Sequence, residues 1–90
     1  MTFKIVALED IGSDTLLDVR EIGEFEAGCF DNAQHVALSK LSLTVDVMQE
    51  FDKTHTYILY CVKGMRARNA AQIMRDGGFE NVCLLDRGYA

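Results

Sequence analysis

One stretch constrains this sequence more than any other, because within it a strand pattern changes abruptly into a helical one. Residues Thr56–Tyr60 are apolar, aromatic and β-branched, which is the profile of a buried strand. After residue 66, alanines and a methionine recur at helical spacing until a pair of glycines supplies a helix stop. The sequence therefore predicts a strand, a tight loop that contains Gly64, and a helix.

Cys61 lies at the point where this strand gives way to the loop. The backbone N–H groups at a helix start have no intrahelical partner and point toward the preceding loop. Lys63 and Arg66 add positive charge within a few residues. Both effects stabilise a thiolate over a thiol, so the sequence predicts a reactive Cys61. The alternative is that Cys61 is one more small apolar residue at the end of a strand.

The heptapeptide CVKGMRA at residues 61–67 resembles the active-site loop of the rhodanese-like sulfurtransferases. Two further segments fall in that family's order, LLDVRE at residues 16–21 and the last strand with its glycine-tyrosine turn at residues 79–90. The resemblance covers nearly the whole chain. It implies a catalytic Cys61 and a substrate-binding loop formed by Val62, Lys63, Gly64, Met65, Arg66 and Ala67.

The chemistry implied by the resemblance is transfer of a sulfane sulfur in two steps. Cys61 would attack an anionic donor such as thiosulfate and keep the sulfur as a persulfide, and a thiol or cyanide acceptor would remove it. The acceptor thiol could belong to a protein. The loop amides would hold the anionic persulfide, and Lys63 and Arg66 would attract the donor. This chemistry requires neither a cofactor nor a metal.

Two other functions remain open. Phosphatases and arsenate reductases share a cysteine-loop-arginine design, but they typically place five residues between the two, and this chain has four, Val62 to Met65. The smaller loop suits a single sulfur atom better than a tetrahedral oxyanion. The third hypothesis is a non-catalytic module that uses the same loop to dock a protein.

Length and composition narrow the class further. The 90 residues are 49% hydrophobic and 26% charged, which predicts one globular domain over residues 1–90. A net charge of −5 argues against nucleic acids and anionic membranes as partners. We find no apolar run long enough to span a bilayer and no signal-peptide core. Three cysteines without zinc or disulfide spacing favour the reducing cytoplasm.

Strand and helix patterns alternate along the chain. Strands are expected at residues 3–8, 15–19, 34–37, 56–60 and 81–85, with a helical turn within residues 9–14 and a helix at residues 22–27. Residues 38–53 fit both periods, and we assign a helix to residues 43–52 because parallel strands need a crossover. The fold class is therefore α/β, a three-layer sandwich around a mainly parallel, about five-stranded sheet with right-handed crossovers. The site should lie beyond the carboxyl ends of the strands.

The sequence departs from the family in two places. Cys29 stands where the family commonly has histidine, and Asp31-Asn32 stands where it has proline-glycine, although this pair still favours a turn. The family usually continues to a closing helix beyond the position of Ala90, so we expect a domain that lacks this helix and leaves part of its sheet poorly covered.

The remaining polar and sulfur residues are assigned structural roles. The resemblance places Asp18 and Arg20 beside the active-site loop, but we favour a structural role, a helix cap and an ion pair of Arg20 with Glu24. His35 is expected to be structural, whereas His55 should be a solvated surface residue. Cys83 should be a core residue, and Cys29 should be partly exposed.

Overall fold

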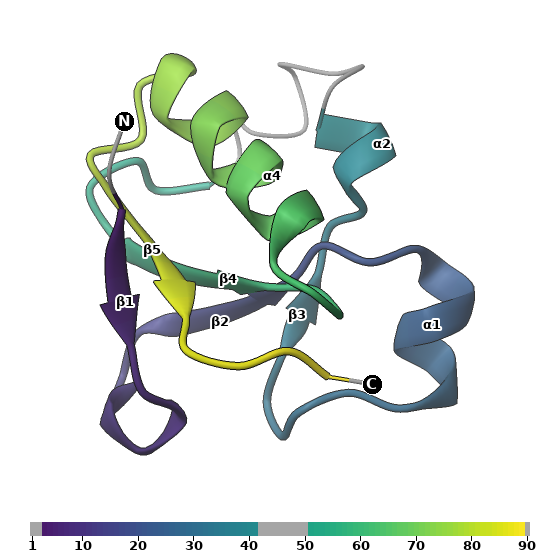
Figure 1. Ribbon diagram of the computed structural model, residues 1–90. Coiled ribbons are helices and arrows are strands. Elements are labelled where there is room, and N and C mark those ends of the chain that lie inside the picture. Colours follow the sequence, from purple (N-terminus) through teal and green to yellow (C-terminus); the bar gives the residue numbers. More distant parts are fainter. Residues whose placement is uncertain (1–2, 42–50, 90) are drawn as a thin grey trace.

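The computed structural model describes residues 3–41 and 51–89, which form an α/β domain around a five-stranded sheet (Figure 1). Along the sheet the strands run in the order β1-β5-β4-β2-β3, and every neighbouring pair is parallel. The predicted α/β fold with a mainly parallel sheet is confirmed. The strands in chain order are β1 Lys4–Val6, β2 Thr15–Asp18, β3 Gln34–His35, β4 Thr56–Tyr60 and β5 Asn81–Leu85.

Strand β4 is the middle strand of the sheet and is buried along nearly its whole length. Its residue Ile58 lies in register with Leu16 of β2 on one side and Cys83 of β5 on the other. A parallel strand with neighbours on both sides and cover on both faces needs a continuous apolar sequence, which Thr56–Tyr60 supplies. Cys61 follows immediately at the carboxyl end of this strand.

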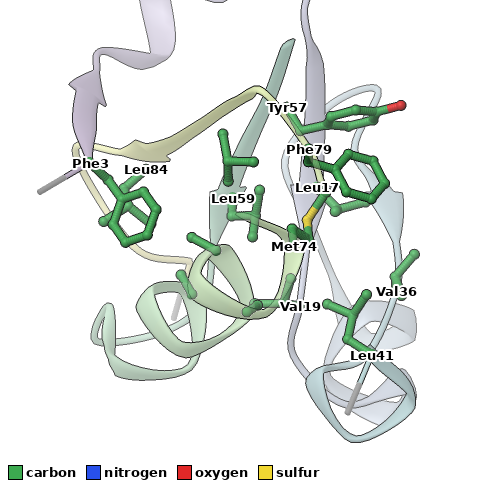
Figure 2. Packing of buried hydrophobic residues seen from close by; sticks show 14 of the residues in the cluster. Phe3, Leu17, Val19, Val36, Leu41, Tyr57, Leu59, Met74, Phe79 and Leu84 are labelled. Carbon is green, nitrogen blue, oxygen red and sulfur yellow. The ribbon is translucent and has the colours of Figure 1, made fainter. Parts of the chain in front are cut away.

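The helices are η1 Leu8–Asp10, α1 Ile22–Ala27, α2 Leu38–Leu41 and α4 Met65–Asp76. Helix α4 crosses one face of the sheet and contacts β4 and β5 (Figure 1). Its buried residues follow helical spacing and are Ala67, Ala70, Ala71 and Met74. Small residues let the helix approach the strands closely, and Figure 2 shows Met74 among the larger core side chains from the sheet and α2.

The two faces of the sheet carry separate apolar clusters. Alternate residues of β4 point to opposite faces, so Tyr57 and Leu59 pack with α4 while Ile58 and Tyr60 pack on the second face. The second cluster is completed by residues outside the strands, among them Leu8, Ile11, Phe30, Ala33 and Tyr89. The C-terminal segment therefore helps to cover the face opposite α4.

Several element boundaries differ from the sequence predictions; strands β2 and β3, for example, end earlier than predicted, at Asp18 and His35. Strand β1 is shorter than residues 3–8, because Leu8 already belongs to η1. The one-turn helix α2 was not predicted, since four residues are too few to show a helical period; its Leu41 is buried in the core. The helix predicted at residues 43–52 lies mostly outside the described residues, and Phe51 and Asp52 are not helical.

Candidate active-site loop

The Cys61 thiol lies at the centre of a loop whose backbone N–H groups point toward it. Cys61 Sγ accepts hydrogen bonds from the N–H of Gly64 at 3.0 Å and from the N–H of Ala67 at 3.4 Å. The residue is only 2% exposed. Two backbone N–H donors at fixed positions therefore converge on this buried sulfur.

Gly64 makes this loop possible. Its φ of 93° lies in the left-handed region, which a residue with a side chain rarely adopts. Gly64 is also the residue that precedes α4, and its carbonyl oxygen accepts the hydrogen bond from Arg68 N that begins the helix. The chain therefore turns from the end of β4 into α4 within four residues, and the N–H groups of Gly64 and Ala67 face the sulfur.

Arg66 has a different partner from the one that the sequence suggested. Its guanidinium makes two hydrogen bonds to the carboxylate of Glu24, Nη1 to Oε1 at 2.6 Å and Nη2 to Oε2 at 3.0 Å. These bonds, with a smaller contribution from the backbone of Glu21, lower the pKa of Glu24 from 4.5 to about 2. The expected pair between Arg20 and Glu24 is therefore wrong, and Arg66 is tied to α1 instead of standing free for a donor.

Of the two predicted loop cations, Lys63 is the one that has no ion-pair partner among the described residues. Lys63 is exposed, and it makes no ion pair within residues 3–41 and 51–89. Two further cations line a hollow beside the loop: Arg87, which pairs with Glu9 and Asp86, and Arg68, which is exposed and unpaired in the described chain. Sequence reasoning did not connect Arg68 with the site.

The predicted site residues come together around two shallow hollows. One, of about 330 Å³, is lined by Cys61, Val62, Lys63, Met65 and Arg66. The other hollow, of about 260 Å³, lies on the side of the C-terminal segment. It is also lined by Cys61, Val62 and Lys63, and in addition by Gly64, Ala67 and Arg68. Met65 is 73% exposed and forms the outer rim. Each of the seven residues from Cys61 to Ala67 therefore lines at least one of the two hollows.

Asp18 and Arg20 form a buried ion pair beside the loop. Their side chains are 0% and 4% exposed, and Arg20 Nη2 lies 2.7 Å from Asp18 Oδ2. Arg20 also donates to the carbonyl oxygen of Gly28 at 2.6 Å. The predicted helix cap at Asp18 is wrong, since helix α1 begins at Ile22 after Glu21, whose backbone N–H bonds to Glu24. Asp18 instead accepts from the backbone N–H of Arg20 at 2.9 Å.

The histidines and the other cysteines lie outside the loop. His35 is structural, as predicted, because its Nε2 bonds to the carbonyl oxygen of Arg20 at 2.7 Å. His55 was expected to be solvated, but it is half-buried and hydrogen-bonded to Thr15 Oγ1 at 2.9 Å. Cys83 is a core residue and Cys29 is half-buried, both as predicted.

No group of histidine, cysteine and carboxylate residues in the described part of the chain could hold a metal ion. None of the helices over the same residues is long and apolar enough to cross a membrane.

Comparison with known proteins identifies the family. A family model described as the rhodanese-like domain matches residues 5–90. The chain belongs to this family. Among solved structures, this rhodanese-like domain resembles one from Anabaena with 26% identity and a TM-score of 0.76, over 84% of this chain and 85% of that one. It also shares its fold with a human single-domain sulfurtransferase, with 22% identity and a TM-score of 0.78, over 94% of this chain and 90% of that one.

Curated relatives of this rhodanese-like domain are longer proteins. A tRNA uridine(34) hydroxylase from Erwinia tasmaniensis is 32% identical over 89 residues, and one from Yersinia enterocolitica is 36% identical over 80 residues. These matches cover 94% and 83% of this chain, respectively. They cover only 25% and 23% of the relatives, so the chain spans about a quarter of their length.

Proposed function

We propose that this rhodanese-like domain is a sulfurtransferase in which Cys61 carries a sulfane sulfur as a persulfide. The donor is a small anion such as thiosulfate, and the acceptor is a thiol, which could belong to a protein, or cyanide. The observation that carries the proposal is the pair of hydrogen bonds from Gly64 N and Ala67 N to Cys61 Sγ. A buried sulfur held by two backbone donors is prepared to become an anion.

The reaction is two displacements at sulfur. In the first, the Cys61 thiolate attacks the outer sulfur of thiosulfate, a new S–S bond forms, and sulfite leaves with the electron pair of the broken S–S bond. In the second, the acceptor thiolate or cyanide attacks the outer sulfur of the persulfide, and the Cys61 thiolate leaves. Dividing one transfer into two steps is covalent catalysis.

The loop supplies the electrostatic part of the proposal. The N–H groups from Val62 to Ala67 would hold the charged outer sulfur of the persulfide in fixed positions, which costs no reorganisation during the reaction. Lys63 and Arg68 would attract the anionic donor, because their charges are unpaired in the described chain. Arg66 would contribute less to this attraction, because its charge is paired with that of Glu24.

The same geometry disfavours the phosphatase hypothesis. A phosphatase of this design needs an arginine that donates both terminal nitrogens to the phosphate. In this loop both terminal nitrogens of Arg66 already bond to Glu24. The spacer of four residues between Cys61 and Arg66 is also one shorter than that design typically uses.

We extend the proposal to neither nucleic acids nor membranes as direct partners. The hydroxylase relatives are named for a uridine of tRNA, but this chain matches only about a quarter of their length. Its net charge of −5 gives it no attraction for RNA phosphates or anionic lipids. Its cysteines at 29, 61 and 83 are free, which suits the reducing cytoplasm as the place of action.

The test is incubation with thiosulfate followed by intact-mass measurement and peptide mapping. We expect one added sulfur atom on Cys61, removed by a small thiol. Cys61→Ser should abolish the adduct, because serine has no adjacent base in this loop, whereas Cys29→Ser and Cys83→Ser should retain it. An adduct on Cys29, equal labelling of all three thiols, or no adduct at all would refute the proposal, and the docking-module hypothesis would replace it.

A further inference from the structure

The segment that follows β5 packs against the base of the Cys61 loop. The backbone N–H of Tyr89 donates a hydrogen bond to the carbonyl oxygen of Cys61 at 3.0 Å. Gly88 approaches so closely that a Cβ at this position would lie 1.8 Å from the carbonyl oxygen of Val62 and 2.8 Å from that of Cys61. Only glycine fits this contact. In Figure 1 this yellow segment runs past the loop before α4 toward α1.

The Tyr89 ring is held in turn by rigid neighbours. The Arg20 guanidinium carbon lies 4.9 Å from the ring centroid, which is the geometry of a cation–π contact. The ring of Phe30 meets that of Tyr89 edge to face, with centroids 4.9 Å apart. Arg20 itself is fixed by its buried pair with Asp18. A connected set of contacts thus extends from β2 through Tyr89 to the backbone of Cys61.

From this arrangement we infer that Gly88 and Tyr89 are positioning residues for the nucleophile, a pair that we name the 88–89 clamp. Gly64 gives the loop conformational freedom. The clamp restricts that freedom by fixing the carbonyl side of Cys61 and Val62, so that the N–H groups of Gly64 and Ala67 stay directed at Sγ. The inference rests on the proposed function, because it assigns the clamp a role in sulfur transfer.

Tyr89 lines neither of the two hollows beside Cys61, so loss of its ring should affect kcat and leave KM nearly unchanged, whereas Gly88 lines one of them and its substitution can change both. Tyr89→Ala removes the ring that anchors the segment, and Gly88→Ala forces the segment away from Val62. A displacement of about 1 Å at reacting atoms can cost roughly 100-fold in rate, so we expect kcat for sulfur transfer to fall by about 10- to 100-fold. Tyr89→Phe keeps the ring and the backbone N–H, and it should restore the wild-type rate.

The experiment measures kcat and KM for transfer from thiosulfate to cyanide, together with the rate of alkylation of Cys61 by iodoacetamide. Free N-acetylcysteine in the same mixture is the reference thiol for alkylation, because Cys29 adjoins Phe30, which contacts Tyr89. Val82→Ala, in the part of β5 beside Tyr57, is the control for a general loss of stability. We expect the alkylation ratio of Cys61 to this reference to fall in Tyr89→Ala and to stay unchanged in Val82→Ala.

Each outcome decides the inference. Wild-type kcat in a folded Tyr89→Ala would overturn it, as would an equal loss of kcat in a Val82→Ala protein of the same melting temperature. If Gly88→Ala does not fold, Tyr89→Ala and Tyr89→Phe still decide. If the wild type takes up no sulfur, the proposed function fails, and the alkylation ratio alone then supports or refutes the clamp.

Discussion

Arg66, at the second position of α4, donates two hydrogen bonds to Glu24 of α1, a residue 42 positions earlier in the chain. The pair connects the N-terminal ends of two helices beside the Cys61 loop. It fixes one side of the loop entrance and neutralises the charge that the sequence had assigned to donor binding. Lys63 is left as the unpaired cation of the loop in the described chain.

The Glu24–Arg66 pair predicts a stability difference that disappears in acid. Hydrogen bonds from Arg66 are the main reason why the pKa of Glu24 is lowered from 4.5 to about 2. A lowered pKa means that the folded state favours the ionised form, so the stabilisation is complete above pH 4.5 and is lost as the pH falls through about 2. We expect Glu24→Gln to unfold at lower urea than the wild type at neutral pH and to converge with it toward pH 2.

The control is Glu26→Gln, which removes the same charge from an exposed position of the same helix. It should leave the urea midpoint close to that of the wild type at every pH. A gap for Glu24→Gln that stays constant down to pH 2 would contradict the pairing.

The wrong partner predicted for Glu24 shows what local sequence can and cannot specify. Arg20 and Glu24 are four residues apart, and this spacing suggested a local pair. Arg20 instead turns to Asp18, and the topology brings Arg66 to Glu24 from a distant part of the chain. Pairs between distant residues depend on how the elements pack, and a single sequence carries no direct signal of this.

Lys63 should attract the anionic donor through a charge that salt can screen. We expect Lys63→Ala to raise KM for thiosulfate by about three- to tenfold at low ionic strength, with a smaller effect at high ionic strength. The measurement is the initial rate of sulfur transfer over a thiosulfate series at several salt concentrations. Lys4→Ala, which removes an equal charge from β1, should change KM little, and an equal effect from both variants would show general charge attraction without a loop site.

Removing one partner of the buried ion pair between Asp18 and Arg20 should strongly destabilise the protein. Arg20→Met leaves the Asp18 carboxylate, which is fully buried, without its charged partner. Removing one partner of a buried ion pair typically destabilises a protein by about 3–5 kcal/mol. We expect a loss of this size in urea unfolding and a smaller loss in the double variant Asp18→Leu/Arg20→Met. A loss below about 1 kcal/mol, typical of a surface pair, would contradict the assignment.

Cys83 should remain unreactive while the protein is folded. Burial is the main cause that raises the pKa of its thiol, so at pH 8 it stays protonated. We expect iodoacetamide to leave Cys83 unmodified in the native protein and to label it rapidly in urea, as peptide mapping would show. Native labelling at the rate of the half-buried Cys29 would mean that β5 opens far more readily than its burial indicates.

The central strand and the loop after it could be predicted from the sequence because each depends on residues that are close together in the chain. The run Thr56–Tyr60 predicted β4, and Cys61 with Gly64 predicted the turn into α4. The short helix α2 and the half-buried His55 were missed, because the helix is a single turn and the histidine's partner, Thr15, lies 40 residues away. The contact of Gly88 with Val62 likewise follows from tertiary packing alone.

Hydrolysis of aryl phosphates is the assay that best distinguishes a phosphatase from a sulfurtransferase. Arg66 donates from both terminal nitrogens to Glu24, and the four-residue spacer is one shorter than phosphatases of this design typically use. We therefore expect hydrolysis of p-nitrophenyl phosphate at no more than the background rate of Cys61→Ser. Glu24→Gln weakens the hold on Arg66 but keeps the short spacer, so it should not create phosphatase activity. Turnover that depends on Cys61, and that rises when one residue is inserted between Val62 and Met65, would place phosphate ahead of sulfur as the substrate.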